Sequence, residues 1–223
     1  MIRKSHFTRT LIFMIWLLGF QSVSAHRPLW GDEKGVTEIP NLQTSYAYYR
    51  QLSDDQPYHI FTFEGNSDQT FFAGINIPAI SGLETYEVTA ALVGPGLPKE
   101  GQEQLPLEPP EDTGVLIFPS EMGEDFFEPF TQTRYWGRQE MDVPLPQDGE
   151  YYLVIWNEDN VDGKYVLDTG RREEFSPVDI VRFPIWWLQV HLFFEHGVYI
   201  LAGALAIILG VGLLILWVRR RAA

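Results

Sequence analysis

Histidines and one short acidic loop are the parts of this chain whose residue types could bind a metal ion. A chain cut between Ala25 and His26 begins with a histidine, whose α-amine and imidazole can together chelate copper. Such a site needs a second imidazole, and His59 is the next histidine along the chain. His59 also shares a strand face with Phe61 and Phe63, which is typical of a partly buried structural histidine. The pattern therefore predicts either copper ligation by His26 and His59 or no copper site.

The loop at residues 157–163 reads NEDNVDG and places several oxygen ligands between two predicted strands. Asp159 and Asp162 are the carboxylates that could bind calcium there. Calcium takes about six to eight oxygen ligands, and the loop lacks the residue spacing of an EF-hand. Because Asn, Asp and Gly are also ordinary turn formers, a plain hairpin loop is the alternative.

A further pair of histidines precedes the C-terminal apolar segment. His191 and His196 are spaced so that a continuous helix would set them about 140° apart. His191 and Glu195, in contrast, have the spacing of residues that share a helix face. A metal or haem site is one interpretation, and polar residues at a membrane surface are the other.

Recognisable catalytic motifs are missing. None of the serines after residue 25 lies in a nucleophile-elbow pattern, and residues 94–98 form a turn without a phosphate-binding helix behind it. The acid pairs Glu111-Asp112 and Glu124-Asp125 fall in predicted loops. The chain has no cysteine, which excludes disulfides and thiolate metal sites. We therefore expect a protein that is not an enzyme.

Both ends of the chain carry targeting signals. Residues 1–25 combine basic residues, a short apolar run and small residues before a cleavage point, the layout of a secretory signal peptide. Residues 198–218 hold no charge and are long enough to cross a bilayer. Residues 219–223 begin with three arginines, which favours the cytoplasmic side. The sequence predicts a single-pass protein of the cell membrane, with its N-terminal domain outside the cytoplasm.

The extracytoplasmic part is strongly acidic. Between the signal peptide and the tail, ten lysines and arginines stand against 30 aspartates and glutamates, a formal charge of −20. Such a surface repels nucleic acid, so we expect no nucleic-acid partner, and it attracts cations or basic partners. Keeping an exported domain soluble is the simpler explanation for these charges.

Residues 26–175 show the period of two that is typical of half-buried strands. Residues 71–77 and 85–92 both alternate in this way. Residues 151–156 are apolar on both faces, which favours a central strand. We therefore predict a mainly β domain, an antiparallel β-sandwich or jelly roll. Further strands are expected at residues 45–52, 58–64, 114–118, 150–156 and 164–168, and the central core residues are expected to be Tyr151, Leu153, Ile155, Tyr165 and Leu167.

Two segments of this domain are predicted to be loops. Residues 95–110 are rich in Pro, Gly and Glu, which disfavours both strand and helix. Residues 125–146 hold five aromatic residues among polar ones. We expect this second loop to pack across the sandwich through its own aromatic side chains.

Residues 176–197 connect the domain to the membrane span. Residues 183–197 are dense in Trp and Phe, with Pro184 near a helix start, and predict an interfacial helix after a hinge at residues 171–181. Within the span, small residues recur at four-residue spacing on one helix face. This spacing allows a second copy or another membrane protein to approach closely, and the residues are Ala202, Ala206 and Gly210.

The last two predicted strands carry a shared pattern. They read GEYYLVI at residues 149–155 and GKYVL at residues 163–167. Together with the strand YHIFTF at residues 58–63, they resemble bacterial pre-peptidase C-terminal domains. The resemblance implies a jelly-roll-like accessory domain that binds, spaces or assists secretion and has no active site. The chain departs from the usual setting of that family because a membrane anchor follows the domain.

A second resemblance concerns the predicted mature N-terminus. The start at His26 is similar to that of histidine-brace copper enzymes and of β-sandwich copper chaperones. The sequence thus favours a membrane-anchored extracytoplasmic binding or accessory module that engages another envelope protein or a ligand. A copper-binding protein that uses His26 is the alternative.

Overall fold

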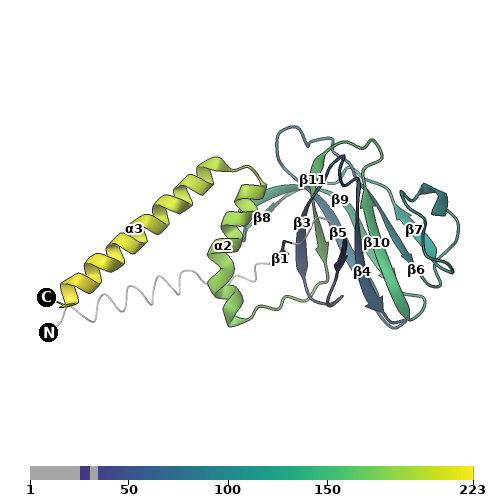
Figure 1. The fold of residues 1–223 in the computed structure, drawn as a ribbon, viewed down its shortest axis with the longest axis horizontal. Helices are drawn as coiled ribbons and strands as arrows, with labels where there is room; N and C mark the ends of the chain where they lie inside the picture. The colour runs from purple at the N-terminus through teal and green to yellow at the C-terminus, as the bar shows by residue number, and fades with distance from the viewer. Residues whose placement is uncertain (1–25, 31–34, 223) are drawn as a thin grey trace.

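The computed structural model of the 223-residue chain describes residues 26–30 and 35–222. The predicted signal peptide lies outside the described residues. These residues form two packed β-sheets followed by two helices, and Figure 1 shows the helices to one side of the sandwich. The predicted mainly β sandwich, followed by a helix and a long apolar helix, is therefore confirmed.

Sheet A has six strands in the order β1-β3-β11-β5-β9-β8, and sheet B has five in the order β2-β4-β10-β6-β7. The described strands pair antiparallel except at two edges, where the short β1 and β2 run parallel to β3 and β4. The bounds in sheet A are β1 (Arg27–Leu29), β3 (Tyr46–Leu52), β11 (Gly163–Thr169), β5 (Thr70–Pro78), β9 (Thr133–Pro144) and β8 (Asp125–Glu128). Those in sheet B are β2 (Val36–Glu38), β4 (Tyr58–Gly65), β10 (Gly149–Trp156), β6 (Thr89–Gly94) and β7 (Gly114–Phe118).

Strand β10 lies in the middle of sheet B, as its apolar sequence predicts. Leu153 faces Phe61 of β4 on one side and Leu92 of β6 on the other. The five predicted central core residues are all fully buried between the sheets. Because β11 occupies the corresponding position in sheet A, the closing hairpin supplies the central strand of each layer.

The prediction of a loop at residues 125–146 is wrong, because this segment forms β8 and the long strand β9. A bulge opposite Ile75 and Asn76 inserts Arg138 as an extra residue in β9. The bulge changes the side of the sheet to which alternate residues point, so Tyr135 lies on the outer face and Met141 in the core. This change of phase hides the period of two in the sequence.

The other predicted loop is confirmed. Residues 95–110 contain only one short 3-10 turn, η1 (Gln102–Gln104), and no strand. Strand β6 begins at Thr89, later than the alternation from residue 85 predicts. The residues that this alternation places on one face nevertheless share the core, namely Tyr86, Val88, Ala90 and Leu92.

Helix α2 (Pro177–Phe193) begins earlier than expected. Ser176 and Asp179 form a capping box, in which each side chain bonds the backbone N–H of the other residue. Pro177 fits the first helical position, whereas Pro184 lies inside the helix and removes one backbone hydrogen bond. The predicted hinge at residues 171–181 therefore includes the first turn of α2.

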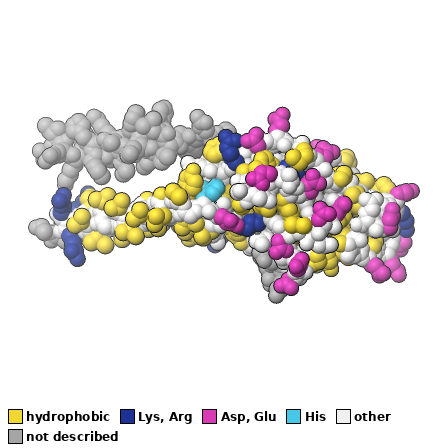
Figure 2. Space-filling view, turned by 90° about the horizontal axis from the view of Figure 1, so that it is seen from above, with side chains coloured by type: hydrophobic (Ala, Val, Ile, Leu, Met, Phe, Trp, Pro, Cys, Tyr) yellow, Lys and Arg dark blue, Asp and Glu magenta, His cyan; other side chains and the backbone are white. Residues whose placement is uncertain are grey.

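Helix α3 (Gly197–Ala222) is long and apolar enough to cross a membrane. Its span Gly197–Arg221 contains an 18-residue window with a mean hydropathy of 2.7, and no residue of that window is buried by the rest of the protein. Figure 2 shows this apolar rod projecting from a body dotted with acidic side chains, with basic residues at its far end. A candidate membrane span of this kind fits the predicted single-pass architecture.

Candidate binding site

Asp168 is the carboxylate on sheet A that lines both adjoining hollows of the candidate site. Alternation along β11 turns Tyr165 and Leu167 into the core, so Asp168 points to the outer face of sheet A. Asn76 on the neighbouring β5 donates a hydrogen bond of 2.6 Å to one oxygen of this carboxylate. Burial raises the pKa of Asp168, and the nearby His26 and the bond from Asn76 offset part of this effect.

A cavity of about 220 Å³ lies beside Asp168, and its walls are largely aromatic. The ring of Phe126 stacks on that of Tyr135, with centroids 5.3 Å apart and planes at 17°. The hydroxyls of Tyr49 and Tyr135 lie 3.3 Å from each other. His26 also lines the cavity, and the aromatic wall residues are Tyr49, Phe126, Phe127, Phe130 and Tyr135. A second hollow adjoins this one, since both share His26, Phe126 and Asp168.

Glu128 shapes the mouth of the cavity by holding the turn between β8 and β9. Its carboxylate accepts hydrogen bonds from the backbone N–H of Phe130 at 2.8 Å and of Thr131 at 2.5 Å. The hydroxyl of Thr131 donates to the same carboxylate. These bonds fix the turn, so the ring of Phe130 is set over the cavity by local structure.

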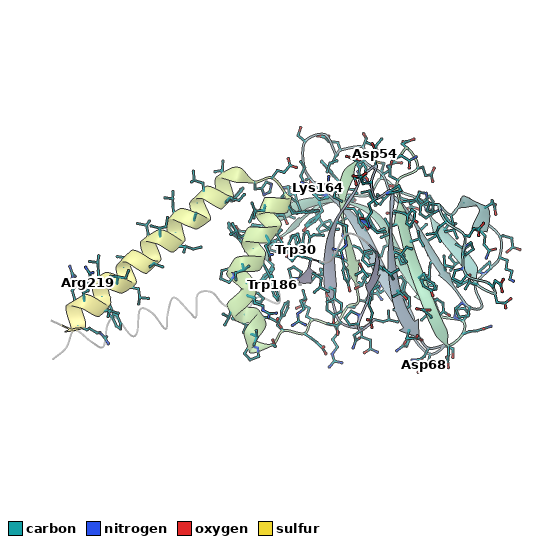
Figure 3. All side chains as sticks on the ribbon, viewed as in Figure 1. Trp30, Asp54, Asp68, Lys164, Trp186 and Arg219 are labelled. Carbon is teal, nitrogen blue, oxygen red and sulfur yellow. The ribbon has the colours of Figure 1, made fainter. Side chains whose placement is uncertain are left out.

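Helix α2 packs on the outer face of sheet A next to this cavity. Trp30 lies between the helix and the sheet (Figure 3), stacked on Tyr49 at 4.6 Å with Phe193 edge-on at 5.9 Å. Phe130 of the cavity wall meets Phe183 of α2 at 4.9 Å. The cavity is therefore flanked by the helix that leads to the candidate membrane span.

Besides its apolar packing, the end of α2 is held to sheet A by the side chain of Lys164. Lys164 on β11 donates hydrogen bonds to the carbonyl of Phe193 at 2.9 Å and to the carboxylate of Glu195 at 2.6 Å. Because α3 begins at Gly197, this contact lies at the corner between the two helices. It holds the base of α3 against the sandwich.

The structure does not bring His26 and His59 together. The imidazole of His59 lies between the sheets, where its Nδ1 is 2.7 Å from the hydroxyl of Tyr165. His26 lies on the opposite face of sheet A, with its Nδ1 2.5 Å from Oγ of Ser45. Burial and the charge of Arg50 lower the pKa of His59 to about 4, as for a neutral core histidine. The geometry gives no support to a copper pair made of these residues.

The acidic loop at residues 157–163 uses its polar groups to build a turn. Asn157 accepts from the backbone N–H of Val161 at 2.8 Å and donates to the carbonyl of Glu87 at 2.6 Å. Asp162 accepts from the backbone N–H of Asp54 at 3.1 Å. Over residues 26–30 and 35–222, no three acidic or histidine side chains converge as metal ligands, Asp159 and Asp162 included. Calcium binding by this loop stays a prediction without support from the geometry.

His191 and His196 do meet, although a continuous helix would separate them. Helix α2 ends at Phe193, and Glu195 adopts a left-handed conformation with φ of 60°. This turn brings the Nδ1 atoms of the two rings to 3.0 Å. Burial lowers the pKa of both imidazoles, and for His191 the charge of His196 adds to this effect. The pair belongs to the packing at the corner between α2 and α3.

Sequence reasoning missed Asp168 as a site residue. This residue is the last of a predicted strand, where a polar side chain that faces solvent is common. Two signals pointed toward the cavity. Val166 also faces outward on β11, which indicates that something covers this face. The segment 125–146 also carries five aromatic residues, and four of them line the cavity: Phe126, Phe127, Phe130 and Tyr135.

Comparisons with known proteins show limited similarity. The chain matches no family model, and no curated protein matches its sequence. Among solved structures, the chain is similar to the pre-peptidase C-terminal domain of a collagenase from Bacillus anthracis, with 12% identity and a TM-score of 0.33. That alignment covers 61% of this chain and 96% of the other. It is the same family that the closing hairpin resembles, and the fold assignment itself rests on the two sheets described above.

Proposed function

We propose that this protein is a membrane-anchored, extracytoplasmic binding or accessory module without catalytic activity. The observation that carries this proposal is the docking of α2 on sheet A, directly before an apolar helix that is exposed along its length. This arrangement supports a position of the sandwich at the membrane surface, with its aromatic cavity beside the anchor. The module would present that cavity to a ligand or to another envelope protein.

The free side of α2 supports a position at the lipid surface. Four exposed apolar side chains fall on one face of the helix, at spacings of three, four and seven residues: Val178, Val181, Ile185 and Leu192. Val190 and Phe194 on the other side pack against sheet A. A helix that is apolar on both sides and continues into a membrane span suits the headgroup region.

The chemistry of the cavity supports binding over catalysis. Glu128 is engaged in holding the turn, and Asp168 is bonded to Asn76. The remaining walls are mostly aromatic rings, which bind by contact, and burial raises the pKa of Tyr49 and of Tyr135, so neither phenol is activated as a nucleophile. We assign no reaction to this site.

Membrane fractionation tests the proposal. The full chain should stay with membranes after carbonate extraction, and protease added from outside should remove the sandwich. A chain that ends at residue 196, which lacks α3, should be released in soluble form and serves as the control. A full chain that is soluble, or whose sandwich resists external protease in intact cells although it is cleaved after lysis, contradicts the proposed location.

A helix contact within the membrane is also part of the proposal. Ala202, Ala206 and Gly210 are exposed on α3 and share a face on which a second helix can approach closely. Because the chain has no cysteine, Ala206→Cys introduces a single thiol. Oxidation in membranes should cross-link this variant more than Ile208→Cys, whose side chain points to another face. Equal cross-linking of the two variants would show that this face is not the contact.

A further inference from the structure

We propose that the aromatic cavity beside Asp168 binds a small organic ammonium group. This inference rests on the proposed function as a binding module and names the chemical class of its ligand. The group could belong to a free amine or to the headgroup of an amine-bearing lipid. Both sources present the same cation to the same walls.

The cavity walls favour a cation with little bound water. Five aromatic rings surround the space, and the face of an aromatic ring attracts a positive charge. Phe126 and Phe127 are 41% and 51% exposed, which leaves apolar rings at the surface without a covering group. A quaternary ammonium with apolar substituents contacts such rings more favourably than water does, and a more strongly hydrated primary ammonium can in addition donate hydrogen bonds to Asp168.

The carboxylate of Asp168 supplies the complementary charge. Asn76 bonds one of its oxygens, and the residue also lines the cavity. Across the described parts of the chain, no lysine or arginine forms a salt bridge with Asp168. A partly buried carboxylate is costly unless a cation is near it, and His26 offsets only part of the effect of burial. An ammonium group in the cavity would offset the remaining cost of burying the charge of Asp168.

Other ligand classes fit the site less well. A calcium ion needs several converging oxygens, yet the carboxylate of Glu128 already accepts three bonds from its own turn. An anion would face two carboxylates and a domain of net charge −20. The volume of about 220 Å³ is small for a drug-sized ligand but suits a headgroup of the size of choline or ethanolamine.

The decisive experiment titrates the full chain in uncharged detergent micelles with choline and with tetramethylammonium by calorimetry. Saturable binding is expected in the millimolar range or tighter. The neutral isostere 3,3-dimethylbutan-1-ol has the same shape as choline without its charge, and it should bind at least about tenfold more weakly. Equal binding of choline and the isostere, or no saturation by either cation up to about 100 mM, overturns the proposal.

Two variants connect the binding to the site. Asp168→Asn keeps the shape and the partner Asn76 but removes the charge, and Phe126→Ala removes a wall ring that is already partly exposed. Each should weaken choline binding about tenfold. Asp68→Asn is the matched control, because this exposed carboxylate lies away from α2 (Figure 3) and should change nothing. If Asp168→Asn fails to fold, Phe126→Ala decides alone, and unchanged affinity in either folded variant contradicts the assignment.

A comparison of nanodiscs of different lipid composition distinguishes a lipid headgroup from a free amine as the source of the cation. It also separates failure of the ligand assignment from failure of the proposed function. Nanodiscs that contain phosphatidylcholine should reduce the binding of free choline if the headgroup fills the cavity, relative to nanodiscs of phosphatidylglycerol alone. Equal binding in both identifies a free amine as the ligand. Loss of ammonium binding with normal membrane anchoring refutes the ligand assignment only, whereas a soluble or wrongly oriented chain refutes the proposed function.

Discussion

The side chain of Arg27 on β1 donates hydrogen bonds of 2.7 and 2.6 Å to the two carboxylate oxygens of Asp179 in the first turn of α2. Asp179 is fully buried and also closes the capping box with Ser176. The bonds from Arg27, with smaller contributions from Ser176, lower the pKa of Asp179 to about 2. The first described strand thereby fastens the helix that precedes the candidate membrane span.

Removing this contact should loosen α2. Arg27→Gln leaves a buried carboxylate with only its bonds to Ser176, and we expect a loss of about 1–3 kcal/mol in the free energy of unfolding. Faster amide exchange in the first turns of α2 is the direct measurement. Arg172→Gln removes a surface ion pair with Glu174 and should cost little. Equal effects of the two substitutions would contradict a special role for Arg27.

The same contact predicts a response to acid. A carboxylate whose pKa is lowered on folding stabilises the native state above its unfolded pKa, and this contribution is lost as pH falls through the folded value. For Asp179 the loss runs from about pH 4 to about pH 2. Exchange at α2 in the unsubstituted chain should rise over this interval, while Asp179→Asn should show faster exchange already at neutral pH and no such rise.

Without α2, the sandwich should self-associate. A fragment of residues 26–175 exposes the surface that α2 covers, which includes Tyr49, Tyr135 and Val166. This fragment should bind a dye for apolar surface and associate with increasing concentration. A fragment of residues 26–196 keeps α2 and should do so much less. Indistinguishable behaviour of the two fragments by size-exclusion chromatography would show that α2 is dispensable.

The central strands could be predicted because their pattern is local. The apolar run of β10 has no polar face, which requires layers on both sides, and Leu153 and Ile155 are indeed fully buried. β9 could not be predicted in this way, because the bulge at Arg138 depends on pairing with Ile75 and Asn76 about sixty residues earlier. A single-strand pattern carries no information on such a long-range partner.

The candidate site depended even more on distant segments. Asp168 on β11 and Phe126 on β8 are separated by β5 and β9 in sheet A, yet both line the cavity, so the site depends on the pairing of strands that are distant in sequence. The start of α2 shows the opposite case. Its capping box at Ser176 and Asp179 is a local signal that outweighed the later Pro184, so a closer reading of caps would have found it.

Ile155 tests the core. Ile155→Ala removes part of a fully buried side chain on the middle strand of sheet B, and we expect a loss of about 2–5 kcal/mol in unfolding free energy. Val161→Ala is the control, since Val161 is 55% exposed in a loop. Thermal unfolding followed by circular dichroism measures both. A loss under about 1 kcal/mol for Ile155→Ala would show that neighbouring core side chains fill the space left by the removed atoms.

Copper titration tests the alternative function. His59 is held in the core, so the chelate at a mature N-terminus would have the α-amine and imidazole of His26 without this second imidazole. A protein that begins at His26 and one with an additional N-terminal alanine should therefore bind Cu(II) within about tenfold of each other. A tight site that the added alanine abolishes would establish copper binding in place of the accessory role.

The buried imidazole of His59 makes the stability of the sandwich depend on pH. Burial and Arg50 lower its pKa from 6.5 to about 4, so between these values the unfolded chain binds a proton that the native state excludes. The free energy of unfolding should therefore fall as pH falls from about 6.5 to about 4, by about 3 kcal/mol at most. Chemical denaturation at a series of pH values measures this slope.

The variant His59→Gln separates this effect from other titrating groups. Glutamine retains a polar partner for the hydroxyl of Tyr165 but cannot take up a proton, so the variant should be less stable at pH 7 and should lose most of the slope. Asp168 acts in the opposite direction, because burial raises its pKa and the native state then binds a proton more readily as pH falls. If the slope between pH 6.5 and pH 4 is unchanged in His59→Gln, the buried histidine is not its source.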